Sequence, residues 1–266
     1  MFNLIASIPI STFAVSVASL ICFITLFILD NSAQASILKG GFESGEFSDE
    51  WISIGEASIV QETYGVTPVE GEFQALITTK SSSVPDRCSM LYLICLESFL
   101  ELPAGSLDTL IPEGVVEGSA IKRSFSVQAG DTLSFSWNFL SNETIFDQDS
   151  TTFNDVAFVS IGTVENFADT SNLHGSSNTI FDTESGYQTF SHTFTEGGTY
   201  LLGIGVLDAK DDNDFFASGV LIDNIEIHPV EIQSVPEATI ILGWFVVLGT
   251  GVFLKNNHAN EDKNSE

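Results

Sequence analysis

Apolar and polar residues alternate with a period of two through the middle of the chain, as they do in β-strands with one buried face. The clearest example has four apolar residues separated by single polar ones: Leu133, Phe135, Trp137 and Phe139. Residues 121–127 show the same alternation just before it. Because the tripeptide Ala-Gly-Asp ending at Asp131 is a typical turn sequence, the two segments are predicted to form a β-hairpin.

Five further segments have the length and composition of strands: Phe73–Thr79, Asp155–Ile161, Tyr187–Thr195, Thr199–Leu207 and Gly219–His228. Glu196-Gly197-Gly198 predicts a turn between two of them, and one short helix is expected at 96–102. Many short strands joined by turns predict an all-β, antiparallel β-sandwich.

Each end of the chain carries an uncharged apolar run of 17 residues, Phe13–Leu29 and Ala238–Leu254. An Ala-Gln-Ala sequence ending at Ala35 has the form of a signal-peptidase site, which predicts a signal peptide cleaved after Ala35. As a helix, the second run would be about 25 Å long, at the lower limit for crossing a bilayer. Both runs predict export of the middle of the chain, and an uncleaved N-terminal anchor would export it too.

A proline-glutamate pair, Pro236-Glu237, directly precedes the second run, and Lys255 follows it. This order resembles the PEP-CTERM sorting signal of Gram-negative bacteria, although Ala238 stands where that motif has its second proline. The resemblance implies recognition by an exosortase, cleavage near the motif, and delivery from the membrane to the surface or matrix of an exopolysaccharide producer. A C-terminal membrane anchor that is never processed is the alternative.

The chain is therefore divided into a signal peptide (1–35), a β-sandwich domain (36–232) and a sorting signal (233–266), the last with a motif (235–237), a transmembrane helix (238–254) and a polar tail (255–266). Its 36 acidic and 8 basic residues give a net charge of −28, which repels phosphate backbones and excludes nucleic acid as a partner. Such acidity either keeps an exported domain soluble or binds divalent cations.

Cys88 and Cys95 are the two cysteines outside the signal peptide. A disulfide between them would close a short loop and agrees with an oxidising compartment. Two unpaired thiols in an apolar stretch are the alternative. The cysteines and histidines are not spaced for a zinc site.

The predicted sandwich begins with a Gly-Gly-Phe-Glu segment ending at Glu43 and ends with Asp223-Asn224. The pair of segments resembles the first and last strands of carbohydrate-binding-module-like jelly rolls. In that family the two segments lie side by side and commonly hold a structural calcium. The resemblance covers the terminal strands and not the strands between them.

A physical argument also favours calcium at Glu43 and Asp223. Asp223 alternates in phase with apolar residues of the last predicted strand, which places its carboxylate toward the core. A buried carboxylate must be paired or bound to a metal to offset its lost hydration, and calcium prefers oxygen ligands. In the alternative phase Val220 and Ile222 face inward, and Asp223 is solvated.

The sequence contains no G-x-S-x-G, H-E-x-x-H or glycine-rich phosphate-loop motif, so a non-enzymatic function is expected. The leading hypothesis is an exported structural protein of the cell surface or extracellular matrix. The second is a carbohydrate-binding module for secreted polysaccharide, and a hydrolase with paired carboxylates is the third. A row of exposed aromatics would favour sugar binding, whereas a sheet face of serines and threonines would favour the structural role.

Overall fold

In a computed structural model of the chain, the structure describes residues 41–47, 50–80, 84–88, 94–111, 114–143, 154–209 and 216–230. These residues form two antiparallel sheets packed as a sandwich, which confirms the predicted antiparallel β-sandwich. The predicted signal peptide, Ala35, the Pro236-Glu237 motif and the transmembrane helix lie outside the described residues. Within the described part, no helix is long and apolar enough to span a membrane.

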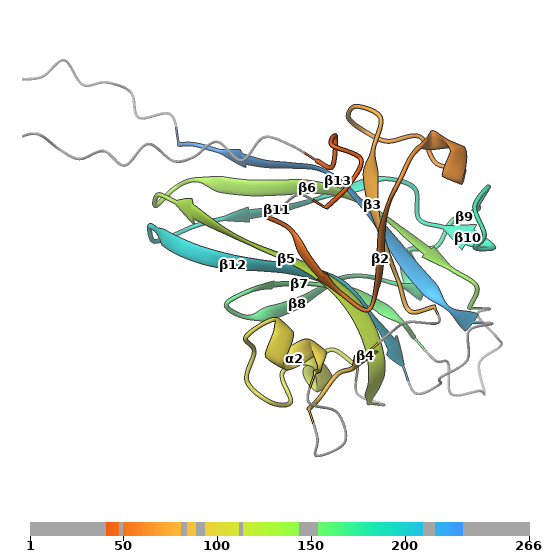
Figure 1. Cartoon of the computed structure of the whole chain (residues 1–266), viewed down its shortest axis with the longest axis horizontal. Coiled ribbons are helices and arrows are strands. Elements are labelled where there is room, and N and C mark those ends of the chain that lie inside the picture. The colour runs from red at the N-terminus through yellow and green to blue at the C-terminus, as the bar shows by residue number, and fades with distance from the viewer. Residues whose placement is uncertain are drawn as a thin grey trace, which may run out of the picture.

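Sheet A contains, in spatial order, β2 (Glu56–Val60), β3 (Gln74–Thr78), β13 (Ser218–His228), β6 (Thr132–Ser141), β10 (Thr183–Glu184) and β9 (Gly175–Ser176), and β11 (Gln188–Thr193) also pairs with β6. Sheet B contains β1 (Ile52–Ile54), β5 (Val115–Val127), β12 (Gly198–Ala209), β7 (Val156–Ile161) and β8 (Val164–Asp169), and β4 (Val84–Pro85) also pairs with β5. The short helices are η1 (Glu62–Tyr64), α2 (Leu96–Phe99), η2 (Leu107–Thr109) and η3 (Thr170–Asn172). In Figure 1, β6 and β13 lie above β12, β7 and β8.

The predicted hairpin between residues 121–127 and 133–139 is wrong. β5 pairs with β1 and β12 in sheet B, whereas β6 pairs with β13 and β11 in sheet A. The turn after β5 therefore carries the chain from one sheet to the other. The link between β11 and β12 does the same, and the Phe194 amide donates to the Asp131 carbonyl at 2.9 Å, which joins the two links. A period-two pattern identifies the buried face of a strand but not its neighbour.

The five other predicted strands and the short helix are present, with ends that differ by a few residues. The main core lies between the sheets, and the alternation in β6 predicts its inward residues correctly: Phe135, Trp137 and Phe139 are each at most 4% exposed. Trp51 is equally buried and packs against Phe42. Both tryptophans of the described sandwich are therefore buried in its main core.

A second crossing between the sheets occurs at Gly55, which separates β1 in sheet B from β2 in sheet A. Its φ of 74° is in the left-handed region that favours glycine. A β-carbon there would overlap Ser119, whose hydroxyl accepts a hydrogen bond from the Glu56 amide at 2.8 Å. This glycine is required both by its conformation and by the close approach of β5.

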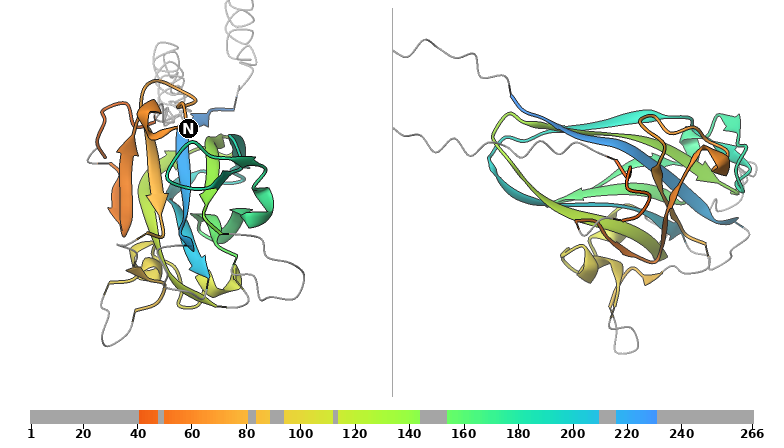
Figure 2. Two further views of the ribbon diagram at one scale, coloured as in Figure 1. Left: turned by 90° about the vertical axis from the view of Figure 1, so that its right-hand side faces the viewer. Right: turned by 45° about the horizontal axis from the view of Figure 1, so that its top comes forward.

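The outer face of each sheet is partly covered. On sheet B the cover is segment 94–111, which includes α2 and η2 and packs through Leu96 and Leu107. On sheet A it consists of segments 62–73 and 175–187, which pack around Leu140 and Leu221 through residues such as Phe181 and Tyr64. Figures 1 and 2 show α2 outside sheet B, on the opposite side of the sandwich from η1, β9 and β10.

Candidate functional site

The phase of β13 changes at a bulge, and this decides where Asp223 lies. The pairing of β13 with β6 shifts between Asp223 and Glu226, and Asn224 has a φ of 48°. Before the bulge Val220 and Ile222 face the main core, and after it Ile225 and Ile227 do. Neither single phase expected from the sequence is therefore right. Asp223 points to the outer face of sheet A, opposite the core, yet it is 0% exposed.

Backbone amides surround the Asp223 carboxylate. Its Oδ2 accepts hydrogen bonds from the amides of Val69 (2.6 Å) and Glu70 (3.0 Å), and its Oδ1 accepts one from Asn224 (2.7 Å). Burial raises the pKa of Asp223, and the nearby Glu43 raises it further, while these amides act in the opposite direction. Hydrogen bonds to this charged group thus offset part of its desolvation.

Glu43 holds the end of the same loop, which we call loop 65–73. Its carboxylate accepts hydrogen bonds from the amides of Glu72 (2.9 Å) and Phe73 (3.4 Å). A β-carbon on Gly71, whose φ is 64°, would overlap this carboxylate. Two acids that are far apart in the sequence therefore fasten one loop through its backbone amides.

The two carboxylates lie close together beside Gly41. A β-carbon on Gly41 would lie 2.9 Å from Asp223 Oδ1 and 3.9 Å from Glu43 Oε1, so glycine leaves open the space that both oxygens border. The expected neighbourhood of Glu43 and Asp223 is thus observed. Carboxylate oxygens around such a space are ligands that suit calcium. The described residues hold no group of three or more His, Cys, Asp or Glu side chains able to bind a metal, so further ligands would have to be carbonyls or water.

Gln74 links this loop to the neighbouring segment. The Gln74 side chain is fully buried, and its Nε2 donates to the Val66 carbonyl at 2.7 Å. Its Oε1 accepts a hydrogen bond from the Tyr187 hydroxyl. Burial raises the pKa of Tyr187, and the charges of Asp223 and Glu184 add to the shift. Loop 65–73 is therefore fastened at Val66 through Gln74 as well as by the two carboxylates.

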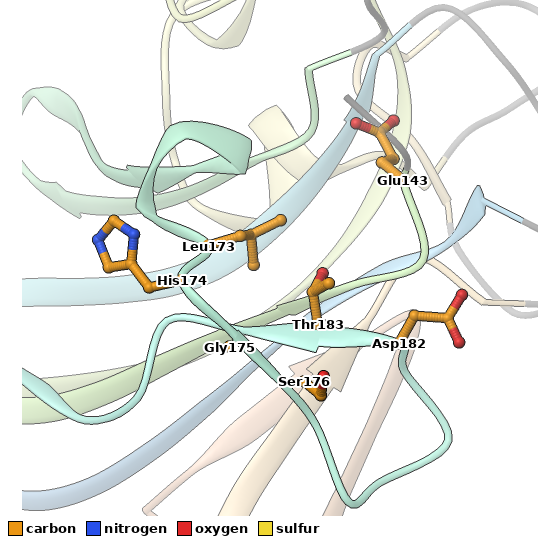
Figure 3. Close-up of a pocket in the computed structure, with 7 residues that line it drawn as sticks. All are labelled: Glu143, Leu173, His174, Gly175, Ser176, Asp182 and Thr183. Carbon is orange, nitrogen blue, oxygen red and sulfur yellow. The ribbon is translucent and has the colours of Figure 1, made fainter. Parts of the chain in front are cut away.

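Two shallow depressions lie beside the β9–β10 ribbon. One, of about 390 Å³, is lined by nine residues: Val66, Asn138, His174, Gly175, Ser176, Glu184, Ser185, Gly186 and Tyr187. The Asn138 amide nitrogen at its floor donates to Glu184 at 2.6 Å, and its oxygen accepts from Ser185 at 3.2 Å. The other, of about 520 Å³, is lined by the residues drawn in Figure 3, in which Leu173 and His174 project in opposite directions.

A serine and a histidine meet on the outer face of sheet A. The Ser134 hydroxyl lies 3.0 Å from His228 Nε2, a contact that sequence analysis missed because β6 and β13 are far apart in the chain. Glu226 approaches the same nitrogen, at 3.4 Å. In a catalytic triad the acid instead binds the other ring nitrogen and orients the base. The side chain of His228 is also 56% exposed, so this trio lacks both the orientation and the enclosure of a hydrolase site.

Hydroxyl groups form rungs along the same face. In the pairing of β11 with β6, every second pair, on the outer face, is serine or threonine: Thr189–Ser136, Ser191–Ser134 and Thr193–Thr132. The last two hydroxyls are hydrogen-bonded at 2.9 Å. Of the aromatic side chains that the structure describes, only Phe216 is exposed, at 40%. The uncovered part of sheet A is therefore a hydroxyl surface without an aromatic row.

The structure joins Cys88 to Cys95 by a disulfide at the start of the cover on sheet B. The bridge ties Cys95, directly before α2, to the segment that follows β4. Arg87 next to it pairs with Asp86 and Asp108, so charges also hold this end of the cover.

No protein-family model and no curated protein matches the chain. Among solved structures, TmCBM61 in complex with β-1,4-galactotriose is 13% identical, with a TM-score of 0.35, over 71% of this chain and 94% of that one. The K1 cleaved adhesin domain of Lys-gingipain from Porphyromonas gingivalis W83 is 9% identical, with a TM-score of 0.38, over 73% and 98%. The enzymatically active domain of bacteriophage CBA120 tailspike protein 4 is 9% identical, with a TM-score of 0.31, over 71% and 21%. At such low scores we argue function from the chain's own residues.

Proposed function

We propose that the chain is an exported, non-enzymatic protein of the cell surface or extracellular matrix, released by signal peptidase, sorted by an exosortase and associated with exopolysaccharide. The hydroxyl rungs of β6 and β11 are the observation that carries this choice. Short hydroxyl side chains on this face suit hydrogen bonding within a hydrated matrix, whereas sugar-binding faces use aromatic platforms. The Cys88–Cys95 disulfide supports the exported location, because structural disulfides persist in oxidising compartments.

Mass spectrometry of the protein from its native host tests the sorting proposal. The expected N-terminus is Ser36, and the expected C-terminus lies near Pro236-Glu237. A Glu237→Ala variant should change C-terminal processing and leave the melting temperature of the sandwich unchanged. Full-length chain with Met1 and Glu266 intact in the mature surface fraction would refute both cleavages.

We further propose that calcium stabilises the sandwich at Glu43 and Asp223. Bound there, the cation would supply positive charge between two carboxylates, while the chain's own part is to hold those carboxylates with the amides of loop 65–73. Because only the folded state assembles the pair, calcium should raise stability by about 2.7 kcal/mol at a hundred times its dissociation constant.

Thermal unfolding in chelator and in millimolar calcium tests this proposal. The melting temperature should rise with calcium in the native chain and in Glu165→Gln, which removes an exposed acid on β8. It should not respond in Asp223→Asn. An equal melting temperature of the native chain in chelator and in calcium would refute the calcium site. The Glu43 and Asp223 carboxylates would then be stabilised by backbone amides alone.

Carbohydrate binding is the second candidate function, favoured by the depression that Tyr187, Asn138 and Glu184 line. One ring beside amide and carboxylate groups is a polar combination suited to a sugar. Affinity electrophoresis in the host's own exopolysaccharide compares the native chain with Glu184→Gln and with the exposed-site control Glu165→Gln. Retardation that only Glu184→Gln abolishes would establish this function. Equal mobility of all three with and without polysaccharide would reject it.

A further inference from the structure

Among the described strands of five or more residues, β11 is the most exposed, and it lies at an edge of sheet A. Four of its six residues are exposed, and in the described structure it pairs with β6 alone. The strand has the sequence QTFSHT, which contains no proline and no Lys, Arg, Asp or Glu. An edge strand presents unpaired amide and carbonyl groups that pair readily with another strand.

The other described edge strands carry features that hinder pairing. β8 contains Glu165 and Asp169 and lies against a bulge in its pairing with β7. β4 is two residues long and includes Pro85, while β9 has two residues and β1 has three. β2 begins with Glu56 at the crossing between the sheets. Charge, proline and short length are the usual means of protecting edges, and β11 has none of them.

The strand also suits a second copy of this chain. Two copies with a net charge of −28 repel each other, so they approach most easily where each is uncharged. If the outer face of each copy continues the outer face of the other, antiparallel β11 strands must oppose residues of the same side. Ser191 then opposes the second copy's Ser191, or Phe190 opposes the second copy's Phe190.

The hydroxyl residues of β11 distinguish these two registers. With Phe190 at the centre, Thr189 opposes Ser191, but Thr193 would oppose Tyr187, which lies outside the strand. With Ser191 at the centre, all three hydroxyl residues on the outer face of β11 oppose hydroxyl residues, and such cross-strand pairs are stabilising. The Ser191 register also places Thr189 opposite Thr193, so that the hydroxyl rungs continue from one copy to the next.

We propose that the chain self-associates through β11, with two copies paired antiparallel about Ser191 so that their A sheets form one continuous sheet. The association is isologous and closes as a dimer. It goes beyond the proposed function and requires neither the cation nor export, although pairing of this kind would give a matrix protein a means of assembly.

Single-cysteine cross-linking of the full chain in detergent tests both the surface and the register, in a Cys22→Ser background. Opposed residues of an antiparallel pair have Cα atoms about 4.5–5.5 Å apart, within the range of about 4.4–6.8 Å that a disulfide needs. Ser191→Cys should therefore form a covalent dimer under mild oxidation. Thr193→Cys is the matched control, because its counterpart lies four positions farther along the strand, roughly 13 Å away.

Pairing about Ser191 predicts cross-linking at least about tenfold faster for Ser191→Cys than for Thr193→Cys, since the paired strands raise the effective thiol concentration. Equal rates would mean random collision and would overturn the proposal, as would a faster reaction of Thr193→Cys or no reaction of either.

Sedimentation provides a second measurement. Ser191→Lys should abolish the dimer while Ser126→Lys, an exposed change on β5, retains it. Because each lysine reduces the net negative charge, repulsion between the whole copies would not explain the loss, whereas two lysines opposed at position 191 would.

Discussion

The two covers of the sandwich are held in place by different kinds of interaction. On sheet B, segment 94–111 packs through Leu96, Leu100 and Leu107 against apolar residues of β5, β7 and β12, and a disulfide fastens its start. On sheet A, amides of loop 65–73 donate to two carboxylates, and Gln74 adds a buried hydrogen bond. Apolar packing is non-directional and tolerates rearrangement, whereas fully buried polar groups such as Asp223 and Gln74 are stable only when their hydrogen bonds are made. Loss of one polar group should therefore affect its cover more than loss of one apolar side chain affects the other.

Removal of the Asp223 carboxylate should give the largest effect. Asp223→Ala leaves the part-buried amides of Val69, Glu70 and Asn224 without their acceptor. An unsatisfied buried donor costs about 1–3 kcal/mol, so three part-buried donors, at the low end of that range, give an expected loss of about 4 kcal/mol. Chemical denaturation in chelator measures it. Glu165→Ala removes an exposed acid and should change stability by less than about 0.5 kcal/mol. If both variants lose equally little, loop 65–73 does not depend on the carboxylate.

The cover on sheet B should lose about 3 kcal/mol in Leu96→Ala, because the side chain is fully buried and its removal leaves a cavity. Hydrogen exchange should increase in segment 94–111 and not in loop 65–73, which shows that the covers are independent. Ile94→Ala is the control, since Ile94 is 69% exposed two residues before it. Faster exchange in both covers would indicate that they unfold together.

The sequence predicts those parts of this contrast that depend on local pattern or composition, and it does not predict those that depend on how distant segments pack. The inward residues of β6 follow from local alternation, and the disulfide partners follow from the small number of cysteines. The neighbourhood of Glu43 and Asp223 was expected from a resemblance between terminal strands. The sequence pattern does not reveal the bulge after Asp223 or the amides of loop 65–73, because both depend on how separate segments pack.

Reduction of the Cys88–Cys95 disulfide should have a smaller effect, a loss of about 2 kcal/mol, because the bridge closes a short loop. The native chain should show no free thiol from these cysteines when it is denatured and alkylated without reductant. A Cys88→Ser/Cys95→Ser variant should unfold at lower denaturant concentration. It should still be stabilised by calcium at Glu43 and Asp223, beside loop 65–73. Full alkylation of the unreduced chain would show that the exported protein carries two thiols instead.

The smallest effect concerns Tyr64, which lies in η1 at the start of the cover on sheet A. Burial raises the pKa of its hydroxyl from 10.0 to about 12, so the folded state holds the neutral phenol more strongly than the unfolded state does. The stability linked to Tyr64 is therefore fully present below pH 10 and is lost as the pH rises to about 12. At neutral pH, Tyr64→Phe should change the free energy of unfolding by less than about 1 kcal/mol. At alkaline pH, tyrosinate absorbance should lose one late-titrating group in the variant. If that group persists in Tyr64→Phe, or if the native chain shows no tyrosine titrating near pH 12, the cover leaves the hydroxyl open to water and is looser than the cover on sheet B.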